Sequence, residues 1–168
     1  MKTGATNMTA DGESTTEMTV CVSRLIKAPR QRVFDSWVKP ELRRKWWLTE
    51  SGDEVLKRCE IDARVGGRYF QSQIGNCEES DAGDNYEWTM EGEFLEFVEP
   101  ERLVFTWNVN HPDEPPTDER VTIEFTEVEG GTEVTIIHRG ILKSHLRDGT
   151  EKGWTTALET QANVLQRE

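Results

Sequence analysis

The chain has 168 residues, of which 35% are hydrophobic and 31% are charged. Its 32 Asp and Glu outweigh 20 Lys and Arg, and the resulting net charge of −12 argues against nucleic acid or an anionic membrane surface as a partner. The length is that of a single domain, and six Trp with six Phe are enough aromatic residues to exclude a wholly disordered chain.

The first 16 residues are mostly Gly, Thr, Ser, Asn and Asp. Such a segment buries too little apolar surface to be ordered, so we expect a flexible N-terminal tail (residues 1–16) followed by one folded domain (residues 17–168). The tail has no apolar run typical of a signal peptide, and the three cysteines suit reduced thiols. We therefore expect a cytoplasmic protein.

Two kinds of element are predicted next. Apolar and polar residues alternate from Met18, which predicts a first strand. Two short helices then follow. The first has apolar residues at helical spacing, namely Val33, Phe34 and Trp37. The second is expected over Pro40 to Trp47, with Leu42 and Trp46 buried.

About six further strands are expected between residues 55 and 139, where the period of two repeats and turn residues separate the runs. The first of these strands is predicted to place one set of side chains on the same face: Val55, Lys57, Cys59 and Ile61. Gly92, inside a long run, predicts a bulge or a close approach of two backbones.

Near the C-terminus the period becomes that of a helix, expected from about Thr150 to Gln166. Its buried stripe is Trp154, Ala157, Leu158, Gln161, Ala162 and Leu165. We therefore expect an α+β fold: a curved antiparallel sheet of six to seven strands wrapped around one long C-terminal helix. One helix cannot fill the concave face of such a sheet, which predicts a ligand cavity between them.

Several segments together resemble a known family. They are the run Ile26 to Trp37, Trp46-Trp47, Asp62 to Tyr69, Glu91-Gly92, Pro100 to Trp107, Gly131-Thr132 and Gly153-Trp154. The resemblance is to the Hsp90-ATPase-activator-homologue (AHSA1-like) family of the START/Bet v 1-like superfamily, and it covers about residues 17 to 167. It implies the helix-grip fold. It implies no single activity, because this fold hosts lipid carriers, polyketide cyclases, toxin-sequestering proteins and a co-chaperone domain.

The candidate ligand-binding residues lie on the expected inner faces of the sheet and the helix. They are Phe70, Trp88, Met90, Phe105, Trp107, Ile123, Phe125, His138 and Trp154. His138 shares a face with Val134 and Ile136, so it is either a buried histidine with its hydrogen bonds satisfied or a group that contacts a ligand. The histidines lack the close spacing of zinc ligands and no Cys-x-x-Cys pair occurs, so we expect no metal, no cofactor and no catalytic residue.

Three classes of function fit these observations. We expect first a binding protein for a small apolar or aromatic ligand. The second class, implied by the resemblance, is an interaction module of the Hsp90 co-chaperone kind, whose partner is a chaperone or another protein with a basic surface. The third is an enzyme of the cyclase or hydrolase kind that uses His138 with a carboxylate as an acid–base pair.

Overall fold

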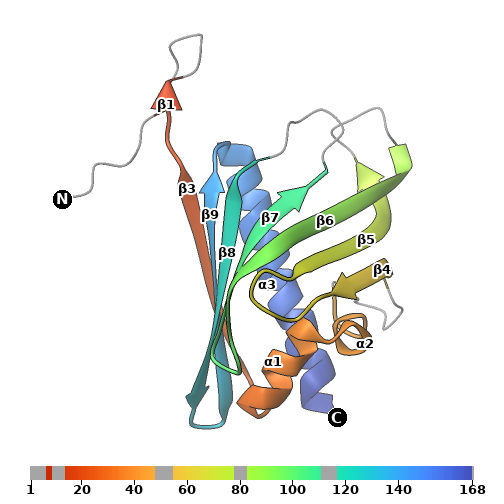
Figure 1. Ribbon diagram of the computed structural model, residues 1–168, viewed down its shortest axis with the longest axis vertical. Coiled ribbons are helices and arrows are strands. Elements are labelled where there is room, and N and C mark those ends of the chain that lie inside the picture. Colours follow the sequence, from red (N-terminus) through yellow and green to blue (C-terminus); the bar gives the residue numbers. More distant parts are fainter. Residues whose placement is uncertain (1–6, 9–13, 48–54, 78–82, 111–116, 168) are drawn as a thin grey trace, which may run out of the picture.

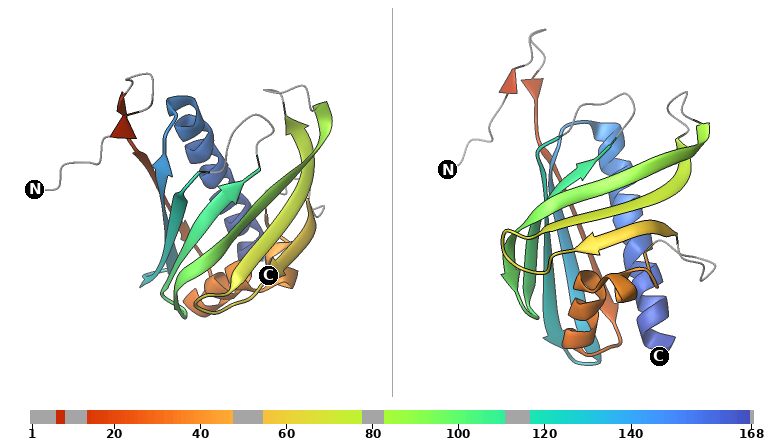
Figure 2. Two further views of the ribbon diagram at one scale, coloured as in Figure 1. Left: turned by 45° about the horizontal axis from the view of Figure 1, so that its top comes forward. Right: turned by 45° about the vertical axis from the view of Figure 1, so that its right-hand side comes forward.

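The structure is a computed structural model that describes residues 7–8, 14–47, 55–77, 83–110 and 117–167 (Figure 1). A seven-stranded antiparallel sheet curls around the long helix α3 (Ser144–Arg167), and Figure 2 shows this wrapping from two further sides. Helices α1 (Arg30–Val38) and α2 (Pro40–Arg43) follow the first strand of the sheet. The expected α+β helix-grip architecture is confirmed.

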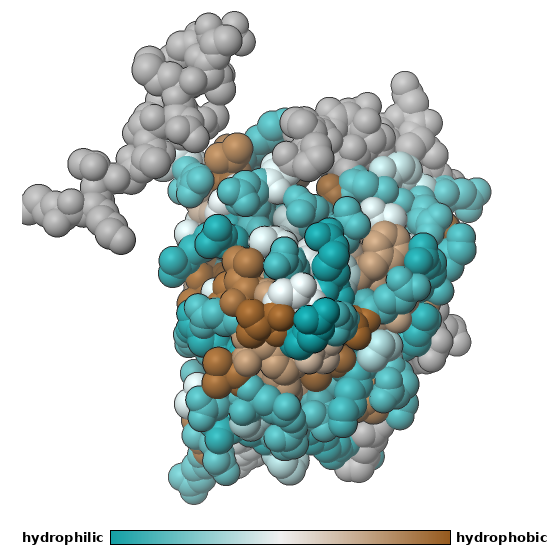
Figure 3. All heavy atoms as spheres, viewed as in Figure 1, coloured by the Kyte–Doolittle hydropathy of each residue, from teal (hydrophilic) through white to brown (hydrophobic). Residues whose placement is uncertain are grey.

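The strands lie in the order β3-β9-β8-β7-β6-β5-β4, and every neighbouring pair is antiparallel. Their bounds are β3 (Met18–Ile26), β4 (Leu56–Ile61), β5 (Arg68–Cys77), β6 (Gly83–Val98), β7 (Arg102–Val109), β8 (Glu119–Val128) and β9 (Gly131–Ile141). The side of the molecule seen in Figure 3 is largely hydrophilic, with hydrophobic atoms gathered over the middle of the sheet.

Within the expected tail, two short strands are described. They are β1 (Asn7–Met8) and β2 (Ser14–Thr15), which pair with each other and not with the large sheet. The tail otherwise falls almost wholly outside the described residues, so its flexibility stays a prediction.

The predicted stripe of α3 is confirmed. Trp154, Leu158, Ala162 and Leu165 are all buried against the sheet, and the helix begins at Ser144 rather than near Thr150. Gly92 lies at a close approach of two backbones, as expected. A Cβ atom added there would come within 1.9 Å of the carbonyl oxygen of Thr106 on β7, so only glycine fits.

Two predictions about local structure were wrong. The second short helix ends at Arg43 instead of Trp47, and Arg43 is buried while Leu42 is only half-buried, because a four-residue helix has no stripe to direct burial. On β4, a register shift between Leu56 and Arg58 brings Leu56 and Cys59 inward and leaves Lys57 exposed. The shift interrupts the simple alternation on which the predicted face rested.

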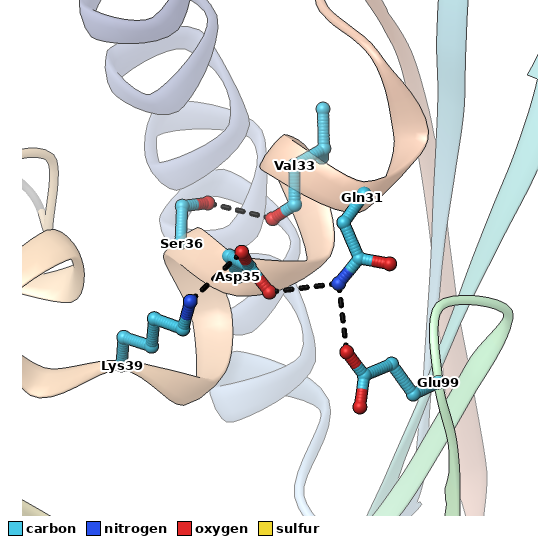
Figure 4. A network of polar contacts seen from close by, with 6 residues as sticks. All are labelled: Gln31, Val33, Asp35, Ser36, Lys39 and Glu99. Carbon is cyan, nitrogen blue, oxygen red and sulfur yellow. Dashed lines mark hydrogen bonds and ion pairs between the residues drawn. The ribbon is translucent and has the colours of Figure 1, made fainter.

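Polar contacts fix α1 against one end of the sheet (Figure 4). The Gln31 side-chain amide donates to Asp35 on its own helix at 2.9 Å and to Glu99 in the β6–β7 turn at 2.7 Å. The buried amide of Gln161 on α3 donates to the hydroxyl of Ser36 on α1 at 2.8 Å. Helix α1 is therefore tied both to the sheet and to α3, and it closes this end of the concave face.

Candidate functional site

A cavity of about 410 Å³ lies between α3 and strands β6, β7 and β9. Its lining residues are Trp47, Trp88, Met90, Trp107, Val109, His138, Leu146, Gly149, Thr150, Gly153, Trp154 and Ala157. The volume lies within the range of roughly 300–1,000 Å³ in which proteins hold small molecules. Among the described residues of the lining, none is Asp, Glu, Lys or Arg.

Four indole rings dominate this cavity. The ring of Trp154 lies 5.1 Å from that of Trp107 and 6.0 Å from that of Trp47, measured between centroids. Trp88 of β6 completes the set and packs edge-to-face on Tyr86 at 4.9 Å. Such a group of rings offers a large, rigid apolar surface on which a flat molecule can stack.

The cavity owes its room to small residues on α3. Gly149, Gly153 and Ala157 follow one another at intervals of four and line it from the helix side. A Cβ atom added at Gly149 or Gly153 would meet no other atom within 4 Å. The surface of the helix is therefore set back along this stretch, which leaves space between it and the sheet.

His138, on β9, is held by hydrogen bonds at both ring nitrogens. The indole N–H of Trp154 donates to its Nδ1 at 2.9 Å, and its Nε2 lies 3.2 Å from Oε2 of Glu119. Because an indole N–H can only donate, Nδ1 must accept, which places the proton of the neutral ring on Nε2, where it is donated to the carboxylate. His138 is therefore a buried histidine with its hydrogen bonds satisfied, and it also lines the cavity.

The chemistry open to this arrangement is limited. His138 does pair with a carboxylate, but the nitrogen that an acid–base role would offer to a substrate already accepts from Trp154. Burial raises the pKa of the Cys59 thiol and of the Tyr69 hydroxyl, the opposite of the shift that activates a nucleophile. Among the described residues, no group of three His, Cys, Asp or Glu side chains is placed to hold a metal ion.

Comparison with known proteins places this geometry in a family. The sequence model of the family described as "Activator of Hsp90 ATPase homolog 1-like protein" matches residues 27–166. The chain belongs to this family. A search of curated proteins finds no significant match.

Solved structures share the fold of this AHSA1-like protein. Protein CV1439 from Chromobacterium violaceum is 25% identical, with a TM-score of 0.70 over 88% of this chain and 97% of its own. A protein from Rhizobium leguminosarum is 20% identical, with a TM-score of 0.73 over 92% and 98% of the two chains. The AHSA1-like protein from Aeromonas hydrophila is 21% identical, with a TM-score of 0.65 over 89% and 93%.

Five of the nine candidate residues line the cavity of this AHSA1-like protein: Trp88, Met90, Trp107, His138 and Trp154. The other four do not. Phe105, Ile123 and Phe125 face inward as expected, but they are buried in the core outside this cavity. Phe70 points to the other face of the sheet, where the Arg58 guanidinium lies over its ring at 4.5 Å. The ligand-binding role of the five stays a prediction.

The nine candidates did not include the remaining lining residues, which are Trp47, Val109, Leu146, Gly149, Thr150, Gly153 and Ala157. Of these, Gly153 was expected to face the cavity from the helix, and the recurrence of Gly149, Gly153 and Ala157 every four residues was a further signal. Trp47 could not be placed, because it follows a helix too short to show a period.

Among the described residues, no helix is long and apolar enough to cross a membrane.

Proposed function

We propose that this AHSA1-like protein binds a small, uncharged aromatic or apolar molecule in the cavity between the sheet and α3. The observation that supports this is the lining itself: four Trp side chains around about 410 Å³, with no acidic or basic residue in the described part of the lining. Burial of an apolar molecule there would gain roughly 25 cal/mol for each Å² removed from water. The rings would also favour flat molecules that can stack.

The polar groups of the lining favour a ligand with few polar atoms. Trp47 donates its indole N–H to Gln73 at 3.2 Å, and Trp154 donates to His138. Both nitrogens of His138 are engaged. A ligand that buried a hydroxyl or a carboxylate against these groups would leave it unpaired, at a cost of about 1–3 kcal/mol. The site therefore suits a ligand with few polar atoms.

The test is a titration of the purified protein with naphthalene and indole, followed by tryptophan fluorescence and by native mass spectrometry. Wild type should bind one molecule with saturation. Gly153→Leu, which fills the cavity from the helix side, should abolish binding while the far-UV CD spectrum stays unchanged. Thr155→Leu adds the same side chain at an exposed position on α3 and should bind like wild type. Binding that survives in Gly153→Leu, or no binding by wild type, would refute the proposal.

A second candidate is an interaction with a chaperone. It is supported by the description of the family, which names an activator of the Hsp90 ATPase, and by the net charge of −12, which favours a basic partner surface. Binding to Hsp90 should then weaken as salt screens the charges, and Gly153→Leu should leave it unchanged. This result separates the two candidates, because only the first depends on the cavity.

A further inference from the structure

Arg43 is a buried cation outside the cavity. Arg43 is the last residue of α2, and it is only 5% exposed. One nitrogen, Nη1, donates to the carbonyl oxygen of Trp37 at 3.2 Å. The other two, Nε and Nη2, are buried and have no hydrogen-bond partner among the described residues. Each buried donor without a partner costs free energy, so their arrangement calls for an explanation.

Aromatic rings provide part of the surroundings of this charge. The guanidinium carbon lies 4.5 Å from the ring centre of Trp47 and 5.3 Å from that of Trp37. Contacts of this kind stabilise a cation, but they supply neither hydrogen-bond acceptors nor a counter-charge. Across the described part of the chain, no carboxylate forms an ion pair with Arg43. Burial lowers the pKa of Arg43, yet a guanidinium keeps its proton in proteins.

A second, much smaller cavity adjoins this group, and we call it the Arg43 cavity. Its lining residues are Trp37, Arg43, Ile61, Tyr69, Phe94, Leu103 and Phe105. The space open to the centre of a water molecule is about 10 Å³, which is room for one water molecule or one small ion. The indole N–H of Trp37 is also buried without a partner among the described residues. Tyr69 already gives its hydroxyl proton to the carbonyl oxygen of Thr106 at 2.7 Å.

The lining residues therefore bring together one positive charge and three N–H groups that have no partner in the described part of the chain, and the other lining side chains are apolar except for the Tyr69 hydroxyl. A water molecule would accept from one or two donors, but it would need acceptors for its own two protons and would leave the charge uncompensated. A monatomic anion accepts from several donors at once and neutralises the guanidinium. We infer that the Arg43 cavity is a binding site for a single halide ion such as chloride. The site is separate from the ligand cavity, and the ring of Trp47 contacts both Arg43 and the ligand cavity.

The first test uses stability, because an ion that binds only the folded state stabilises it by mass action. Thermal unfolding is followed in potassium chloride, bromide and gluconate at equal ionic strength, with gluconate too large for the site. The melting temperature of wild type should be higher in chloride and bromide, by a few degrees, and the increase should saturate. Arg43→Met should remove the difference between the three salts. Arg44→Met is the control and should keep the difference between the salts. Arg44 is the next residue along the chain, and its half-buried side chain donates to the carbonyl oxygen of Leu56.

The second test locates the ion and does not depend on Arg43→Met folding. Crystals grown in bromide should show one anomalous peak beside the guanidinium of Arg43. Trp37→Phe keeps the aromatic packing but removes one donor, and it should weaken the halide affinity several-fold. Equal melting temperatures of wild type in chloride and gluconate, a halide effect that persists in Arg43→Met, or a water without anomalous signal at the site would each overturn the inference. None of these outcomes bears on ligand binding by the larger cavity.

Discussion

The two ends of the concave face are built from the same strands but are filled differently. At the α1 end, the ring of Phe34 packs edge-to-face on Phe97 and Phe125, with centroids 5.5 and 5.3 Å away. At the cavity end, the rings of Trp107 and Trp154 lie 5.1 Å apart, yet about 410 Å³ beside them is left unfilled by side chains. Aromatic residues are abundant at both ends, so their number does not decide which end is closed.

The covering helices decide it. Phe105 and Trp107 lie two residues apart on β7, point to the same face and both belong to the core, but only Trp107 lines the ligand cavity, whereas Phe105 borders the much smaller Arg43 cavity. Helix α1 supplies Phe34 at one end, whereas α3 presents Gly149 and Gly153 at the other. The period of a strand thus assigns a side chain to a face, while the elements packed on that face determine whether the side chain meets a core or a cavity.

The largest effect on stability is expected from emptying the closed end. Phe34→Ala should lower the free energy of unfolding by about 3–5 kcal/mol, because the fully buried ring is lost from its contacts with Phe97 and Phe125 and leaves a cavity. Urea unfolding measures this. Met90→Ala is the counterpart at the cavity end and should cost clearly less, since Met90 already borders open space. Equal losses in the two variants would contradict the difference between the ends.

A smaller effect is expected from the hydrogen bond between Trp154 and His138, which joins α3 to the sheet at the cavity end. Trp154→Phe retains a ring but removes the N–H, which leaves Nδ1 of the buried His138 without its donor. We expect a loss of about 1–3 kcal/mol in the free energy of unfolding. A double-mutant cycle with His138→Phe measures the coupling between the two side chains, and additive losses would show that the bond contributes nothing.

Filling the cavity end should change stability least among these substitutions, and in the opposite direction. Gly153→Leu replaces a poor helix former by a good one, which is worth roughly 0.5–1 kcal/mol in favour of folding. The new side chain enters space that is already there. A rise in the melting temperature together with loss of naphthalene binding is the expected result. A marked loss of stability would instead indicate overpacking and a closed face at this end.

Much of the fold could be predicted because it follows from periods that the chain repeats. The alternation along β8 and β9 placed Ile123, Phe125 and His138 on the inner face, and the structure confirms that they are buried. The stripe that includes Trp154 and Leu158 predicted the buried face of α3 in the same way. Both arguments need several repeats of a period, and both elements supply them.

The site was less accessible from the sequence, for a physical reason. Helix α1 covers one end of the face because it is held there by contacts between residues far apart in the sequence, such as the hydrogen bond between Gln161 and Ser36. No local pattern in the sequence reports such a contact. The period therefore placed Phe105 and Trp107 together, although only one of them lines the cavity. Arg43 was missed because a four-residue helix has no period, and a buried charge without an acidic partner leaves no pattern in the sequence.

Strand β4, which α2 covers, can be tested by a measurement that does not depend on a change in stability. Cys59 is buried there, whereas Cys21 on β3 is exposed. Burial raises the pKa of the Cys59 thiol above its ordinary value of 9.0, and only the thiolate reacts, so poor access and poor ionisation act in the same direction. In variants that keep a single cysteine, iodoacetamide at pH 8 should modify Cys59 at least about tenfold more slowly than Cys21, and urea should abolish the difference. Rapid modification of Cys59 in the folded protein would show that the α2 side of the sheet is as open as the cavity end.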